Sequence, residues 1–246
     1  SEGSAFGIYP NMSQIMIVAV AQSGTTIDTN VYVRLAKERG AYCVALLNKR
    51  QGDISYVVDT TLYLGDGRDI EIAVPSSKTF VAHIIKGYLL CLYLIWTHKK
   101  QKEAVLKEVA ILVQATALIR STLRSIDPEH LDHICTTLIT TRDWYVVYDE
   151  GLEDIALETR IKLSECCYKA VPAYSVLEFK ACDVKGASVI YIPNYRSGAQ
   201  VGDWIKICSL ENNLIILNSL VVANDSYRKI DSCHQVIGQN TDVYPT

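Results

Sequence analysis

Two apolar runs, separated by a glycine-containing turn and an amphipathic segment, constrain the fold of this chain more than any other feature. The runs cover residues 15–20 and 42–47, and the segment between them, residues 26–39, predicts a helix that stops at Gly40. The second run, residues 42–47, is of the kind buried on both faces of a parallel sheet, and parallel strands need a crossover such as the predicted helix. The chain is therefore predicted to have a doubly wound α/β fold.

The turn after the first run reads Gln22-Ser23-Gly24-Thr25-Thr26. It lies at the carboxyl end of a predicted strand, where open α/β sheets bind their ligands. A helix that begins there presents unpaired N–H groups and a partial positive charge, and the three hydroxyl groups of the turn add further donors. A phosphate ester supplies the matching charge and acceptor oxygens. The turn therefore predicts a phosphate site, and the alternative is an ordinary capped turn that binds nothing.

The remaining hydrophobic pattern predicts alternating strands and helices. In the first helix, the apolar face is expected to consist of Ile27, Val31 and Leu35, and Ser76 or Ser77 is expected to cap a later, longer helix. The further predicted elements are a strand over 57–64, helices over 76–97 and 99–124, a strand over 144–148, a helix over 155–169, and strands over 188–192 and 214–217.

The break at Asp127-Pro128 makes residues 125–142 the expected junction between two domains, residues 1–125 and 126–246. The pattern fades beyond residue 224.

Composition excludes several classes of protein. With 246 residues, 49% apolar content and a net charge of −3, the chain is expected to be globular, and its basic residues do not gather into a nucleic-acid-binding patch. The most apolar stretch, residues 87–96, is shorter than a membrane span and is interpreted as a buried helix. Because no leader opens the chain, a cytoplasmic location is expected.

The eight cysteines form no C-x-x-C pair, so reduced thiols are expected. His130 and His133 are interpreted as surface residues, and neither a metal nor another cofactor is predicted.

Three segments together carry a resemblance to a known family. They read A-Q-S-G-T-T-I-D-T over 21–29, E-I-A-V-P-S-S-K-T-F over 71–80, and A-L-E-T-R-I-K-L-S-E-C-C-Y over 156–168. In this order and at this spacing they resemble the isomerase half of glutamine:fructose-6-phosphate aminotransferase, also called glucosamine-6-phosphate synthase. The corresponding runs there read S-Q-S-G-E-T-x-D-T, E-I-G-V-A-S-T-K-A-F and A-L-E-G-A-L-K-L-K-E-I-S-Y. The resemblance covers roughly residues 13–180.

The resemblance implies two sugar-isomerase (SIS) domains, each a flavodoxin-like three-layer α/β/α sandwich with a parallel sheet, and both incomplete in this chain. It implies that Gln22, Ser23 and Thr26 hold the phosphate of a phosphosugar, while Gly24 and Thr25 shape the turn.

The same resemblance assigns the sugar-binding and catalytic positions. Ser76 and the backbone near Val74 and Pro75 are implied to contact the sugar hydroxyls, with Lys78 at the start of the long helix. Glu165 matches the base that moves a proton between C1 and C2 of the sugar, and Lys162 matches a lysine associated with ring opening and charge balance.

A carboxylate partly shielded from water suits such proton transfer, and Lys162, at i−3, lies on the same helix face as Glu165. The alternative is that Glu158, Lys162, Glu165 and Lys169 form an ordinary solvated, salt-bridged stripe.

The chain also departs from the family pattern. Ala21 replaces a serine, Thr25 a glutamate and Ala181 a histidine that the family contributes from a neighbouring subunit. The family's first sugar-binding strand, its carboxyl-terminal lysine tail and its glutaminase domain are not expected in this chain.

Two functions remain open. The first is a fructose-6-phosphate isomerase or aminotransferase module. The second is a phosphosugar-binding SIS protein without turnover, acting as a sensor or a partner subunit. We favour a phosphosugar-binding SIS protein of aminotransferase descent. Its expected partners are fructose 6-phosphate or glucosamine 6-phosphate, a second copy of itself as a homodimer, and a separate glutaminase.

Overall fold

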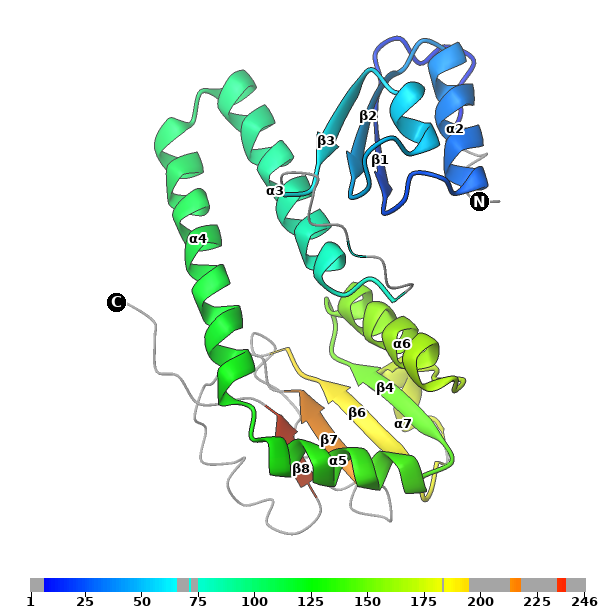
Figure 1. Ribbon diagram of the computed structural model, residues 1–246, viewed down its shortest axis with the longest axis vertical. Helices are drawn as coiled ribbons and strands as arrows, with labels where there is room; N and C mark the ends of the chain where they lie inside the picture. Colours follow the sequence, from blue (N-terminus) through cyan, green and yellow to red (C-terminus); the bar gives the residue numbers. More distant parts are fainter. Residues whose placement is uncertain are drawn as a thin grey trace. The chain divides into compact units, whose positions relative to one another are not determined.

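The computed structural model describes residues 7–65, 71, 75–182, 184–194, 213–217 and 234–237 (Figure 1). The chain divides into two compact units, Ser1–Val113 and Gln114–Thr246. Each unit contains a parallel β-sheet, which confirms the predicted α/β class.

The sheet of the first unit has the order β1-β2-β3. Strands β1 (Met16–Ala21) and β2 (Tyr42–Leu47) pair in parallel from Met16↔Tyr42 to Ala21↔Leu47, and β3 (Thr60–Tyr63) continues the sheet beside β2. Helix α2 (Ile27–Glu38) makes the crossover from β1 to β2, and a short 3-10 helix, η1 (Asp53–Tyr56), precedes β3. The carboxyl ends of β1 and β2 therefore meet at one edge of the sheet.

Helix α2 buries a different face from the predicted one. Ile27, Val31 and Leu35 are 78%, 50% and 40% exposed, and the buried residues of the helix are Asn30, Val33 and Ala36. The core against which the helix packs is built largely from small side chains of the strands, so a face with short residues can approach it closely. Asn30 also turns inward because its amide group bonds to the backbone at the start of the helix.

Helices α3 (Lys78–Lys99) and α4 (Lys102–Ser125) follow β3 and begin two or three residues later than predicted. The expectation that residues 87–96 are buried is wrong, because the buried residues of α3 are Thr79 and Leu92 alone. By length and composition α3 could cross a membrane, although a long helix in a soluble protein passes the same test. It contacts the sheet along a narrow seam near Leu46 and Gly87, which leaves most of its apolar side chains outside the core.

The second unit has a five-stranded parallel sheet in the order β5-β4-β6-β7-β8. Its elements are α5 (Pro128–Thr140), β4 (Trp144–Tyr148), α6 (Glu153–Cys167), β5 (Ala173–Ser175), α7 (Val176–Lys180), β6 (Ser188–Ile192), β7 (Asn213–Leu217) and β8 (His234–Ile237). Ile134 of α5 and Ala156 of α6 pack in one core cluster, whereas Phe179 of α7 packs in another. Helices thus cover both faces of this sheet, as in a three-layer sandwich.

Trp144 anchors the first strand of this sheet. Its indole N–H donates to the carbonyls of Leu138 and Thr141, and the ammonium group of Lys169 lies 4.1 Å from the centre of its ring. A buried tryptophan needs such a partner for its N–H group, so these contacts fix how α5 joins β4.

Several elements of the second unit were not predicted. The pattern at Asp127-Pro128 predicts a junction over residues 125–142, but most of this segment forms helix α5. Pro128 instead occupies the first turn of α5, where its missing N–H group costs nothing, and the side chain of Asp127 accepts from the N–H of Glu129 as the cap. The short elements β5 and α7 and the last strand, β8, were also missed.

Candidate functional site

The turn between β1 and α2 is fixed through its carbonyl groups. The carbonyl of Gln22 accepts from the N–H of Lys49, two residues after β2, at 3.0 Å, and the carbonyl of Gly24 accepts from the N–H of Ile54 at 3.0 Å. The side-chain amide of Asn30 donates to the carbonyls of Gly24 and Thr26 at 3.0 and 2.9 Å. Because these carbonyls are held by the protein, the turn keeps one shape without a ligand.

Two glycines allow the backbone of the turn to adopt this shape. Gly24 has a φ of +74°, a conformation that other residues rarely adopt. Gly52 packs so closely that an added Cβ would lie 2.2 Å from the carbonyl oxygen of Ser23 and 3.0 Å from the Cα of Gly24. Gly52 is therefore part of the turn, although it lies in a different segment of the chain.

The hydroxyl groups of the turn lie together at the start of α2. The Ser23 and Thr25 oxygens are 2.8 Å apart, and the N–H of Thr25 donates to the Ser23 oxygen at 3.3 Å. Thr26 is the N-cap residue, but its side chain makes no capping hydrogen bond. Thr25 and Thr26 are exposed, and Thr25 borders an open pocket of about 270 Å³ that also contacts Asn30 and Arg34. The start of α2 is thus accessible, with hydroxyl donors beside it and no capping hydrogen bond from the side chain of Thr26.

Helix α3 begins differently, because the carboxylate of Glu71 occupies its first turn. One carboxylate oxygen accepts from the N–H and hydroxyl of Ser77 at 2.9 and 3.0 Å and from the N–H of Lys78 at 3.4 Å. The other oxygen accepts from the N–H and hydroxyl of Thr79 at 2.9 and 2.8 Å. The expectation that Ser76 or Ser77 caps this helix is therefore wrong, since Ser77 donates its hydroxyl to the true cap, Glu71.

The hydrogen bonds to Glu71 control its ionisation. Burial on its own raises the pKa of this carboxyl, but the donors of Thr79 and Ser77 outweigh it and lower the pKa from its ordinary 4.5 to about 2. Glu71 is thus a carboxylate at any physiological pH.

The other residues predicted to contact the sugar lie close to this cap in sequence. Ser76 is half-buried, Lys78 is exposed at the first position of α3, and Val74 lies outside the described residues. The turn and the start of α3 are linked at two points. The side-chain N–H of Gln22 donates to the carbonyl of Glu71 at 3.3 Å, and a ring nitrogen of His83 lies 3.3 Å from the carbonyl of Ala21.

The predicted catalytic pair lies on α6, in the second unit. The ammonium group of Lys162 lies 3.3 Å from a carboxylate oxygen of Glu165 and 3.1 Å from one of Glu158. These three side chains are 25%, 35% and 22% exposed, in that order. Burial acts to lower the pKa of Lys162, but its hydrogen bonds to both carboxylates raise it. The carboxyl group of Glu165 is therefore bonded to a lysine and partly shielded from water.

Lys169 does not belong to this stripe. Its ammonium group donates to the carbonyl of Thr141 at 2.7 Å and lies over the ring of Trp144. The alternative of a simple four-residue salt-bridged stripe is therefore reduced to the three residues Glu158, Lys162 and Glu165.

Sequence reasoning missed Asn48, which directly follows β2. Asn48 is 2% exposed, and its buried side-chain NH₂ group has no hydrogen-bond partner among the residues that the structure describes. A buried donor of this kind costs free energy unless something accepts from it. The sequence signal for Asn48 is its place directly after an apolar strand. The same signal identifies the turn after β1.

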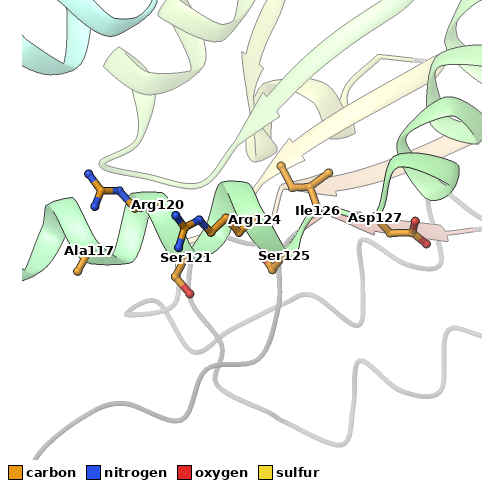
Figure 2. Close-up of a pocket in the computed structure, with 7 residues that line it drawn as sticks. All are labelled: Ala117, Arg120, Ser121, Arg124, Ser125, Ile126 and Asp127. Carbon is orange, nitrogen blue, oxygen red and sulfur yellow. The ribbon is translucent and has the colours of Figure 1, made fainter.

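A larger pocket, of about 680 Å³, lies in the second unit along one face of α4 (Figure 2). Figure 2 shows the guanidinium groups of Arg120 and Arg124 on α4 and Asp127 at the start of α5. Neither arginine makes an ion pair within the part of the chain that the structure describes. None of the predicted site residues lines this pocket. Replacement of its two arginines can therefore test whether an anion binds elsewhere than at the turn.

The sequence relatives of this chain are glutamine–fructose-6-phosphate aminotransferases. The chain is 30% identical over 173 residues to the isomerizing enzyme of Gloeobacter violaceus, which covers 70% of this chain and 28% of that protein. It is 31% identical over 173 residues to the one of Streptomyces coelicolor, which covers 68% of this chain and 27% of that protein. The chain thus matches little more than a quarter of the length of these relatives. No family model matches it.

Solved structures share the fold at low sequence identity. The C-terminal domain of glucosamine-fructose-6-phosphate aminotransferase from Francisella tularensis superposes with a TM-score of 0.77 at 20% identity, covering 97% of this chain and 68% of that one. Tagatose-6-phosphate ketose/aldose isomerase from Escherichia coli gives a TM-score of 0.58 at 13% identity, covering 97% of this chain and 63% of that one. The fold is therefore that of an α/β protein of the sugar-isomerase (SIS) class. Within that class, the chain is a divergent homologue of the isomerase half of glutamine:fructose-6-phosphate aminotransferase.

Proposed function

We propose that this chain binds a hexose 6-phosphate, with the turn from Gln22 to Thr26 as the phosphate site. The observation that carries this proposal is the uncapped start of α2, next to the paired hydroxyls of Ser23 and Thr25. A phosphate group there would accept from backbone N–H groups and hydroxyls in a region of partial positive charge. Homology to fructose-6-phosphate aminotransferases makes fructose 6-phosphate or glucosamine 6-phosphate the preferred ligand.

The chemistry that this chain would perform is proton transfer between C1 and C2 of the sugar. Glu165 would act as the base, because it is partly shielded from water and held in place by Lys162. Lys162 would balance the negative charge that develops on the sugar oxygens. Ser76, Lys78 and the backbone at Val74 are the proposed contacts of the sugar hydroxyls.

The remaining expectations stay proposals. They are two SIS domains that meet near residue 125, a homodimer, a separate glutaminase as the source of ammonia and a cytoplasmic location.

Calorimetric titration of the whole chain tests the proposed ligand. Fructose 6-phosphate should bind, fructose should not, and inorganic phosphate should compete with the sugar phosphate. The variant Arg120→Ala/Arg124→Ala should give the same result as the wild type for each of the three compounds, because these arginines line a different pocket. Absence of fructose 6-phosphate binding to the wild type, or its loss in the arginine variant, would contradict the proposal.

A further inference from the structure

Helices α2 and α3 of the first unit differ in what neutralises their N-termini. The carboxylate of Glu71 occupies the first turn of α3, whereas no side chain caps α2. A helix start that already holds an anion has little attraction for a second one, and like charges there repel. The first unit thus keeps one helix start closed and leaves the other open to a phosphate.

Glu71 also contacts the open site through its backbone. Its carbonyl accepts from the side chain of Gln22, one of the proposed phosphate ligands, at 3.3 Å. The carboxylate of the same residue accepts from the backbone of Ser77 and Thr79, and Thr79 is 2% exposed. One residue therefore touches both the phosphate turn and the first turn of α3.

We propose that Glu71 is the positioning residue of this site. It holds the phosphate turn and the first turn of α3 at a fixed separation, so that the phosphate and the hydroxyls of one sugar phosphate can be bound together. The inference rests on the proposed function, because it assumes that the turn takes the phosphate. Glu71 does not touch the reacting atoms and acts through Gln22 and the start of α3.

The nature of the ligand makes this role measurable. Inorganic phosphate needs only the turn, which Lys49, Ile54 and Gly52 hold without Glu71. A hexose 6-phosphate needs the turn for its phosphate and, at the correct distance, the first turn of α3 for its hydroxyls. Loss of Glu71 should therefore weaken binding of the sugar phosphate much more than binding of inorganic phosphate.

Calorimetry on the full chain with Glu71→Ala tests this difference. The affinity for fructose 6-phosphate should fall about tenfold, and the affinity for inorganic phosphate should change less than about twofold. Added formate should restore part of the loss by replacing the carboxylate at α3, and Glu71→Gln, which keeps one acceptor oxygen, should give a smaller loss. Equal losses for the two ligands, or none, would overturn the positioning role.

Glu178→Ala is the matched control. Glu178 is also a capping carboxylate, since it accepts from the N–H and hydroxyl of Ser175 at the start of α7, but it belongs to the second unit. Its removal should leave both affinities unchanged. A tenfold loss in this variant would show that any lost cap weakens binding, which would contradict a specific role for Glu71.

A measurement without ligand separates this inference from the proposed function. In the ligand-free protein, Glu71→Ala should speed amide hydrogen exchange at Ser77, Lys78 and Thr79, whose N–H groups donate to the Glu71 carboxylate, and Glu178→Ala should not. If the wild type binds no sugar phosphate, the proposed function fails, whereas the exchange data still test whether Glu71 holds the first turn of α3. Unchanged exchange at these three amides would overturn the positioning role.

Discussion

The ammonium group of Lys162 lies 3.3 Å from the carboxylate of Glu165, one helical turn away on α6. The same ammonium also contacts Glu158 on the preceding turn, so one cation is shared by two carboxylates. We propose Glu165, and not Glu158, as the base, and this arrangement allows the two carboxylates to be compared in one experiment.

Glu165→Gln should abolish exchange of the C1 and C2 protons of fructose 6-phosphate with solvent, while affinity for the sugar remains nearly the same. Loss of a general base typically costs a factor of about 10² to 10⁴. Proton exchange is followed by NMR in deuterated solvent, with ammonia supplied. Glu158→Gln is the matched control and should retain most of the exchange. No exchange in the wild type would sink the assignment of Glu165 as a base.

Ser23→Ala combined with Thr26→Ala should weaken binding of fructose 6-phosphate by about 1 to 3 kcal/mol, because hydrogen bonds to a charged phosphate are lost. Calorimetry measures the change. Thr29→Ala, on the same helix but outside the turn, serves as the control. An unchanged affinity in the double variant would count against the phosphate site.

Gly52→Ala should destabilise the first unit by about 1 to 3 kcal/mol and weaken phosphate binding, since its Cβ would meet the carbonyl of Ser23. Urea unfolding and calorimetry report the two effects. Gly87→Ala provides the comparison, because the added Cβ meets only the side chain of Leu46 at 3.9 Å and alanine favours a helix. A fully stable Gly52→Ala variant with normal binding would show that the turn does not need this close approach.

The low pKa of Glu71 predicts how acid affects stability. Because the pKa is lower in the folded protein than in the unfolded chain, the Glu71 contribution is complete above pH 4.5 and disappears as pH falls towards about 2. Wild type should therefore be more stable than Glu71→Gln by about 0.5 to 2 kcal/mol at pH 6, as for other helix caps, and this difference should shrink on acidification. Urea unfolding at several pH values measures it, and a difference independent of pH would refute the assignment.

Asn48→Leu should stabilise the ligand-free protein, because it removes a buried NH₂ group that has no acceptor. The expected gain is about 1 kcal/mol, the lower end of the cost of an unsatisfied buried donor. Thermal unfolding provides the measurement. Asn30→Leu is the contrasting variant and should destabilise, since the amide of Asn30 holds the turn. A large loss of stability in Asn48→Leu would mean that its amide has a structural partner.

The sequence predicts the strands and helices best where one local pattern decides the outcome. The runs of β1 and β2 are apolar at successive positions, and Gly24 and Gly40 mark the turn and the helix end between them. The predicted buried face of α2 is wrong, because the size of a side chain rather than its hydrophobicity decides whether it fits against the small residues of the core. Val33 and Ala36 are buried, and Ile27 is not.

The site is predicted less completely because its parts come from distant segments. Motifs that are local in sequence identified Gln22 to Thr26 and the pair Lys162 and Glu165. The contribution of Gly52 depends on its close approach to the backbone of Ser23. The cap formed by Glu71 depends on its contacts with the first turn of α3. Periodicity and spacing carry no signal for such contacts.

The environment of Trp144 provides a natural optical reporter. Its indole is enclosed under Lys169 and bonded to the end of α5, whereas Trp96 on α3 is exposed. In a variant with Trp96 and Trp204 replaced by phenylalanine, the wavelength of maximum tryptophan fluorescence should follow unfolding of the second unit alone. Circular dichroism recorded on the same samples would then reveal whether the two halves melt in one cooperative step or in succession.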